Sequence, residues 1–157
     1  MIICLECDRA SVWIFDKETE TLWTKVMKGN EKTIKIPYTA GLVGHVFTTG
    51  SVLNIMNAYS DPRFNKEADK ANNYKTNTIL SAPIKSIDGK NVIGVLQSVN
   101  KLNGFFTLDD EALLILMSKI VSIVLRNSQK FDETVMYHNN LRSILRVNMY
   151  FILLDRC

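Results

Sequence analysis

The sequence predicts an α+β domain, in which helices pack on the faces of an antiparallel β-sheet. Three observations lead to this class. Segments rich in β-forming residues occur in two pairs, each joined by a short turn. Two helix signals lie between those pairs: helical spacing of apolar residues in one segment and a helix-start pair, Asp-Pro, in the other. From Leu108 onward the chain contains no glycine or proline and keeps a helical spacing, so a long helix is expected to close it.

The first half of the chain predicts three strands, a helix and a fourth strand. Residues 10–16 alternate and are rich in β-formers, and 21–28 form the partner strand of a hairpin. Residues 32–37 are a third, short strand. Residues 41–50 have apolar side chains at helical spacing and end on a glycine, the residue typical just after a helix. Residues 52–55 are a small strand.

The second half predicts a helix, two longer strands and the closing helix. Asp61 followed by Pro62 is typical of a helix start, with an N-cap and proline in the first turn, so we expect a helix over 61–73. Residues 77–86 and 90–101 read as strands, and the Asp-Gly pair between them indicates a hairpin turn.

The corner that follows the last strand has residues suited to a helix cap and an ion pair. Thr107 is a candidate N-cap, and Asp110 three residues later completes a capping-box pattern. Acidic residues in the first turn suit the helix dipole, and Lys101 can pair with one of them. Phe105 and Phe106 are expected to fold into the core. Carboxylates stacked at a helix start do not face each other across a cleft, which argues against a catalytic pair.

Composition excludes several classes of function. The chain has 157 residues and a net charge of +3, which is too small to indicate DNA or RNA binding. Apolar runs fall short of the ~20 residues of a membrane span. Cys4, Cys7 and Cys157 lack a disulfide framework, so we expect reduced thiols in the cytoplasm, the first two on a helix face. Cys4 and Cys7 have zinc-like spacing, but His45 and His138 lie far apart in sequence, and no metal site is predicted.

The closing helix predicts a dimer contact. Its apolar residues recur at intervals of three or four or their multiples, with polar interruptions, as in a two-helix seam. The seam positions are 113, 117, 120, 124, 131, 141, 145 and 152. We therefore expect one domain over 1–129 and a linker and homodimerisation helix over 130–157. The alternative is that only the first half packs, on its own domain.

Several motifs resemble one family. Asn100–Lys101, then Phe106, then Asp110–Glu111 resembles the N-K-x(n)-F-x3-D-E signature of GAF domains from cyclic-nucleotide phosphodiesterases and related cyclases. "AGLVGHVFTTG" and "LNIMNAYSDPRFN" are similar to two further stretches of that family, in the same order. The match runs from Cys7 to Asn127.

The resemblance implies a six-stranded antiparallel sheet with a ligand pocket under a helical lid, which corresponds to 61–76. It also implies a structural Lys101–Asp110 ion pair and no catalytic residues. The positions that match the family's pocket are Ser11, Met27, Lys28, Leu42, Val43, Tyr59, Asn65, Asp69, Asn72, Thr76 and Gln97. Leu42 and Val43 would offer backbone N–H groups to a phosphate, and the others would meet base, ribose or phosphate.

Each pocket residue also has a purely structural interpretation. Ser11 can be a satisfied strand hydroxyl, Asp69 a solvated helix charge, and Tyr59 a packing residue. Lys28 stands where some cGMP-binding relatives carry an acid. Because a lysine ammonium only donates hydrogen bonds, it cannot accept one from guanine, so the sequence leaves the choice between cGMP and cAMP open.

Two functions follow as expectations. The first is a regulatory domain that binds a cyclic nucleotide, biases an output domain absent from this chain and also mediates dimerisation. A phosphodiesterase is the first expectation for that output and a nucleotide cyclase the second. The other function is a dimerisation module without a ligand. The chain itself is not expected to be an enzyme or to need a cofactor, because its thiols lie at the termini rather than over the pocket. The helix ahead of the first strand is expected to be truncated.

Overall fold

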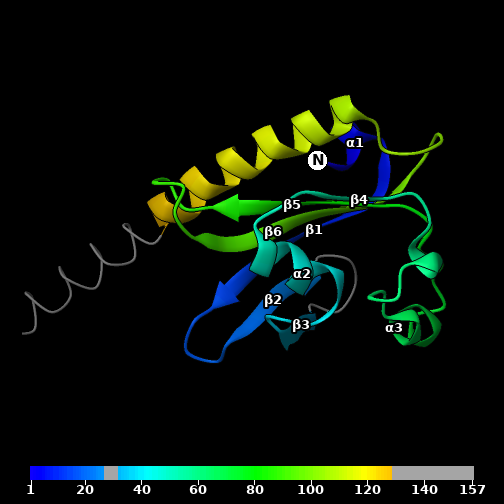
Figure 1. Ribbon diagram of the computed structural model, residues 1–157, viewed down its shortest axis with the longest axis horizontal. Helices are drawn as coiled ribbons and strands as arrows, with labels where there is room; N and C mark the ends of the chain where they lie inside the picture. Colours follow the sequence, from blue (N-terminus) through cyan, green and yellow to red (C-terminus); the bar gives the residue numbers. More distant parts are fainter. Residues whose placement is uncertain (27–31, 129–157) are drawn as a thin grey trace, which may run out of the picture. The chain divides into compact units, whose positions relative to one another are not determined.

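The computed structural model describes residues 1–26 and 32–128. Met27, Lys28 and the seam positions from 131 onward therefore lie outside the described residues. The predicted six-stranded antiparallel sheet is confirmed, with the strand order β3-β2-β1-β6-β5-β4 (Figure 1). The strands are β1 Cys7–Asp16, β2 Thr21–Val26, β3 Lys32–Pro37, β4 Leu53–Ile55, β5 Ile79–Lys85 and β6 Val92–Lys101.

The centre of the sheet is the pairing of β1 with β6 and of β6 with β5. Trp13 faces Val95 on β6, and Val95 faces Pro83 on β5. The β5–β6 connection is the hairpin that Asp88–Gly89 predicts, and Gly89 has a left-handed φ of +72°. A register irregularity follows Ile84, where the hairpin begins.

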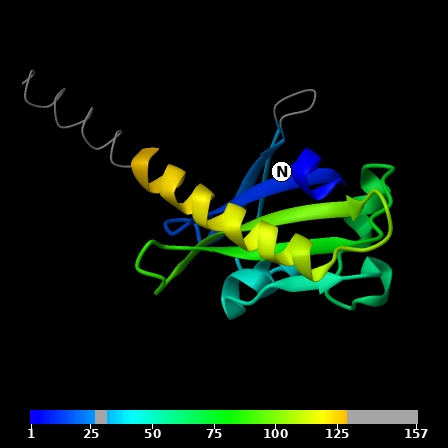
Figure 2. The same ribbon diagram turned by 90° about the horizontal axis from the view of Figure 1, so that it is seen from above.

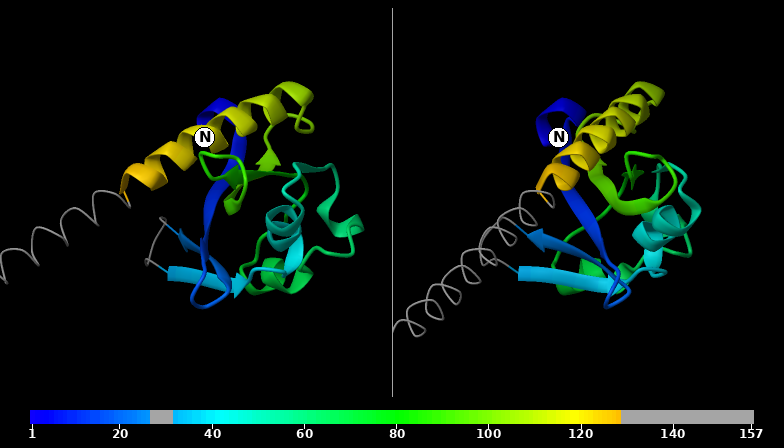
Figure 3. Two further views of the ribbon diagram at one scale, coloured as in Figure 1. Left: turned by 60° about the vertical axis from the view of Figure 1, so that its left-hand side comes forward. Right: turned by 90° about the vertical axis from the view of Figure 1, so that its left-hand side faces the viewer.

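Helices cover both faces of the sheet. They are α1 Ile2–Leu5, α2 Gly41–Thr49, the 3-10 turn η1 Ala58–Ser60, α3 Lys66–Ala71, and a helix that begins at 108 and is helical to 128, the last residue described. The part of that last helix over 108–122 crosses one face of the sheet (Figures 1 and 2). Figure 3 shows α2 and α3 on the opposite face.

The core has one layer on each face of the sheet. On the α2 face, Val43 and Val46 pack with Leu22 and Val95, and Trp13 joins them. Under the 108–122 segment, Leu114 is fully buried, and the hydroxyl of Ser122 donates to the carbonyl of Lys85 at 2.6 Å. Gly50 ends α2 in the left-handed conformation, as its position after the helix predicts.

The corner after β6 is built as the sequence predicts. Lys101 Nζ lies 2.9 Å from Asp110 Oδ1 and 3.0 Å from the carbonyl oxygen of Leu5. Thr107 N–H donates to Asp110 Oδ2 at 2.8 Å, while Asp110 N–H donates to Thr107 Oγ1 at 3.3 Å. Burial alone raises the pKa of Asp110, but the Thr107 N–H and the Lys101 ammonium outweigh it and hold that pKa below its ordinary value.

Phe106 and Glu111, the remaining residues of the N-K-x(n)-F-x3-D-E motif, also contribute to this corner. Phe106 is buried, and its carbonyl accepts a hydrogen bond from Asn54 Nδ2, which also donates to Glu111 Oε1 at 2.8 Å. The prediction that Phe105 is a core residue is wrong, because its side chain is 54% exposed. Only one of two neighbouring side chains in this non-helical segment points toward the sheet.

Two further predictions are corrected. The helix expected over 61–73 is only Lys66–Ala71, and its N-cap is Asn65 rather than Asp61. The Asp61 carboxylate instead accepts from the backbone N–H and the guanidinium of Arg63, which forms a local turn. Cys7 is not on a helix face, since it begins β1 and is buried, whereas Cys4 is an exposed residue of α1.

The predicted seam is described only in part. Leu113 and Met117 are half-buried, while Ile120 and Val124 are exposed. The chain divides into two compact units, Met1–Ser122 and Ile123–Cys157, and only 123–128 of the second are described. The seam therefore stays a prediction. Among the described helices, none has the length and apolarity to cross a membrane.

Replacing Lys101 by methionine should lower the free energy of unfolding by about 3 kcal/mol, because it leaves the largely buried Asp110 carboxylate without its charge partner. Urea denaturation measures this. Lys70→Met is the matched control, since Lys70 pairs with Glu67 at the surface and its loss should cost under about 1 kcal/mol. Equal effects of the two substitutions would contradict a structural role for the buried pair.

Candidate functional site

A row of polar side chains crosses the middle of the sheet on the face that α2 covers. Ser11, Gln97 and Ser81 are direct neighbours on β1, β6 and β5. Because side chains alternate along a strand, Ser11 shares a face with Trp13, which packs against the α2 core. Gln97 Nε2 donates to Ser81 Oγ at 3.2 Å, and Trp13 Nε1 donates to Ser11 Oγ at 3.1 Å. Ser11 and Gln97 are thus brought together.

The start of α2 lies beside this row. Leu42 packs with Ile79, two residues before Ser81, and Val43 packs with Val95, two residues before Gln97. Their side chains are buried core, as the structural interpretation expects. The N-cap residue of α2, Ala40, makes no side-chain capping bond, so the first amide groups of the helix have no intrahelical or capping acceptor. This electropositive end suits an anion.

The lid is organised around the buried carboxylate of Asp69. Asp69 accepts hydrogen bonds from the backbone N–H of Thr76 at 2.6 Å, from Thr76 Oγ1 at 2.9 Å and from the hydroxyl of Tyr59 at 3.1 Å. The interpretation of Asp69 as a solvated helix charge is wrong, since only 7% of the residue is exposed. Burial and the Asp69 carboxylate both raise the pKa of Tyr59, which keeps the phenol a donor.

Other predicted pocket residues make hydrogen bonds or packing contacts within the lid or next to it. Asn65 caps α3 by accepting from the Glu67 N–H, and Asn72 donates to the Ala68 carbonyl. The ring of Tyr59 packs against Phe64 at a centroid distance of 5.4 Å. Met27 and Lys28 lie outside the described residues, so their role stays a prediction.

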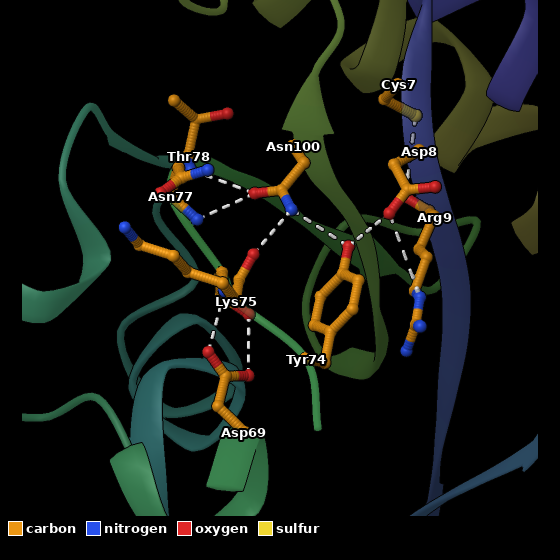
Figure 4. A network of polar contacts seen from close by, with 10 residues as sticks. Cys7, Asp8, Arg9, Asp69, Tyr74, Lys75, Asn77, Thr78 and Asn100 are labelled. Carbon is orange, nitrogen blue, oxygen red and sulfur yellow. Dashed lines mark hydrogen bonds and ion pairs between the residues drawn. The ribbon is translucent and has the colours of Figure 1, made fainter. Parts of the chain in front are cut away.

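The side chain of Asn100 joins the end of the lid to β6. Its Oδ1 accepts from the N–H groups of Asn77 and Thr78, and its Nδ2 donates to Tyr74 Oη and the Lys75 carbonyl (Figure 4). The sequence analysis missed Tyr74 and Ser81. The Asp88–Gly89 turn sets Lys85 opposite Val92, and only the register irregularity after Ile84 brings Ser81 opposite Gln97, so local sequence could place neither Ser81 nor Tyr74.

A groove lies at the other end of the sheet from the polar row. It is an open groove of about 990 Å³ between the β5–β6 hairpin and the C-terminal end of α2. Phe15, Tyr38 and Phe47 form an aromatic cluster in it, and Lys85 and Lys90 lie on its walls. None of the predicted pocket residues lines this groove. The described side chains include no cluster of His, Cys, Asp and Glu suited to a metal ion.

Comparison with known proteins identifies relatives of this chain. Residues 3–125 match the family model described as GAF domain. The chain is 36% identical over 120 residues to the dual 3′,5′-cyclic-AMP and -GMP phosphodiesterase 11A of Takifugu rubripes, covering 75% of this chain and 13% of that protein. It is 33% identical over 159 residues to the "Probable 3′,5′-cyclic phosphodiesterase pde-5" of Caenorhabditis elegans, covering 93% of this chain and 22% of that protein. The chain thus spans a small part of these relatives.

Solved structures share the fold. The GAF domain of a phosphoenolpyruvate-protein phosphotransferase from Coxiella burnetii superimposes with a TM-score of 0.70 at 15% identity, covering 84% of this chain and 79% of that one. The free methionine-R-sulfoxide reductase of Neisseria meningitidis gives 0.67 at 19% identity, covering 82% and 73%. At these identities the likeness establishes the fold alone.

Replacing Asp69 by alanine should loosen the lid without unfolding the sheet, because Thr76 and Tyr59 lose a shared acceptor. Each lost bond to a charged acceptor costs about 1.5–3 kcal/mol. Limited trypsin digestion followed by mass spectrometry should show cleavage after Lys70 and Lys75 accelerated at least about tenfold. Glu67→Ala, an exposed lid carboxylate, is the control. Equal cleavage in the two variants would show that Asp69 does not organise the lid.

Proposed function

The chain belongs to the GAF domain family, and from this premise we propose that it is the regulatory domain of a larger cyclic-nucleotide phosphodiesterase. Its task is to bind a 3′,5′-cyclic nucleotide between the sheet and the lid. The relatives described above are named as cyclic phosphodiesterases rather than cyclases, which favours the first expectation for the output domain. Hydrolysis belongs, in this proposal, to another part of the parent protein.

The observation that carries the proposal is the position of a polar row beside an uncapped helix start. A cyclic nucleotide has a flat base, a ribose and one negatively charged phosphate. The amides of Leu42 and Val43 suit the phosphate, because they lie in the first turn of α2, where no capping side chain competes. Ser11 and Gln97 lie on the same face and offer hydroxyl and amide groups to the base or sugar.

The lid contacts imply a rearrangement on binding. The Asp69 carboxylate already accepts three hydrogen bonds and is only 7% exposed, so a ligand donor would have to move Tyr59 or Thr76 to reach it. We therefore assign the observed lid arrangement to the free protein. Nucleotide binding would then exchange these internal bonds for bonds to ligand, and only the difference between the two sets shifts the lid equilibrium.

The described residues do not favour one base over the other. The side-chain amide of Gln97 both donates and accepts, so it can meet the edge of guanine or adenine. Lys28, the position at which the sequence departs from some cGMP-binding relatives, lies outside the described residues. The choice between cGMP and cAMP is left to the binding experiment.

One specific observation favours dimerisation as a second function. Leu108, Leu116 and Ile120 lie at spacings of eight and four on one helix, and they are 79%, 55% and 54% exposed. Phe105 and Leu102, on the loop before that helix, are also exposed. An apolar surface of this kind on a helix suits a second copy of the chain. Dimerisation and nucleotide binding are compatible, and a dimerisation-only domain is the alternative.

Adding nucleotide should stabilise the protein. At a hundredfold excess over Kd, cGMP or cAMP is expected to raise the free energy of unfolding by about 2.7 kcal/mol, which thermal melting measures against the non-cyclic 5′-monophosphates. Ser11→Ala should reduce this gain by about 1 kcal/mol, whereas the exposed Ser51→Ala should leave it unchanged. No stabilisation by either cyclic nucleotide would favour the dimerisation-only alternative.

The exposed apolar surface at Leu108, Leu116 and Ile120 predicts a dimer that a charged substitution weakens. Sedimentation of the full chain over a range of concentrations should show that Ile120→Glu weakens self-association at least about tenfold, since it places a charge among apolar side chains. Lys119→Glu, an exposed neighbour, should have little effect. If both variants associate like the parent chain, the exposed apolar surface is not the dimer contact.

A further inference from the structure

Within the described residues, the lid hydrogen-bonds to strand β1 through the side chain of Tyr74. After α3 the chain turns at Asn73, which has a left-handed φ of +46°, and Tyr74 N–H donates to the Asp69 carbonyl. The Tyr74 side chain then extends from the lid to the start of β1 (Figure 4).

Three side chains, those of Asp8, Arg9 and Asn100, contact this phenol. Tyr74 Oη donates to Asp8 Oδ2 at 2.5 Å and accepts from Asn100 Nδ2 at 2.9 Å. The guanidinium carbon of Arg9 lies 3.5 Å from the centroid of the Tyr74 ring, and the Arg9 Nε lies 3.9 Å from Asp8. The hydroxyl is satisfied as donor and as acceptor, and a cation covers the ring face.

The other lid contacts are made within the lid, with the neighbouring 3-10 turn η1 and, through Phe64, with the core on the α2 face. Asp69 bonds Thr76 and Tyr59, and Lys70 pairs with Glu67. Within the described part of the chain, Tyr74 is the lid residue whose side chain hydrogen-bonds to β1 and β6. The side chains of Asp8 and Arg9 are 48% and 58% exposed, so this contact can break without opening the core.

We propose that Tyr74 is a positioning residue that fastens the C-terminal end of the lid to the sheet. Its hydrogen bonds to Asp8 and Asn100 and the stacking of Arg9 on its ring set how often the lid opens. If the domain binds a nucleotide in the pocket beneath, as proposed above, the same contacts set how fast that nucleotide leaves. The first statement concerns the free protein, and only the second rests on the proposed function.

Hydrogen exchange of the full chain without nucleotide tests the fastening. Tyr74→Phe keeps the ring under Arg9 but removes the hydroxyl, so exchange of amides 66–77 should rise about tenfold while the β5–β6 hairpin keeps its protection. Asp8→Ala should act in the same way, whereas Asp8→Asn, which retains an acceptor oxygen, should restore most of the protection. Tyr38→Phe, a phenol in the distant aromatic cluster, is the matched control and should change nothing in the lid.

Two results would overturn the fastening. One is lid exchange in Tyr74→Phe equal to that of the parent chain. The other is a rise shared equally by the lid and the β5–β6 hairpin, which is general destabilisation.

Nucleotide kinetics separate this inference from the proposed function. With labelled cGMP or cAMP, Tyr74→Phe should speed dissociation about tenfold, because the lid opens more often. Unchanged dissociation would contradict the link between the fastening and nucleotide release. A parent chain that binds neither nucleotide would refute the proposed function, and the exchange experiment would still decide the role of Tyr74.

Discussion

The arrangement of this domain depends on the charged contact that Lys101 makes at the end of β6. Its ammonium joins the Asp110 carboxylate at the start of the last helix and the Leu5 carbonyl at the end of α1. Both charged side chains are close to 90% buried, so the pair replaces the water that each would otherwise bind. A lysine with one such partner would be poorly satisfied. The capping box at Thr107 supplies the second donor to Asp110 and fixes where the helix begins.

Lys101 and its neighbour Asn100 connect opposite sides of the sheet. Asn100 has a left-handed φ of +57°, and its side chain bonds the segment that follows the lid, while Lys101 bonds the helix corner. A displacement of the lid would therefore act on the backbone next to the Lys101–Asp110 pair. This adjacency gives the regulatory proposal a physical route from pocket to helix.

Most of the fold could be predicted from local sequence, and the errors have identifiable causes. Runs of β-forming residues and turn residues placed the strands, even where both faces of a strand are buried, as in β5. The predicted helix start at Asp61–Pro62 is wrong because the Asp61 side chain binds Arg63, a contact that sequence spacing cannot reveal. The interpretation of Asp69 as a solvated charge is wrong because Thr76 and Tyr59 hydrogen-bond to its carboxylate and help to bury it. The contacts of Tyr74 with Asp8 and Asn100 span 66 and 26 residues, a separation that no periodicity signals.

The most direct test of the account is an amide chemical-shift map of the domain during titration with cGMP and with cAMP. We predict that one of them shifts the amides of Gly41, Leu42 and Val43 together with those of Ser11, Gln97 and the lid, and that the aromatic groove at the other end of the sheet stays unaffected. Shifts confined to that groove, or none at millimolar nucleotide, would contradict a nucleotide pocket between the sheet and the lid.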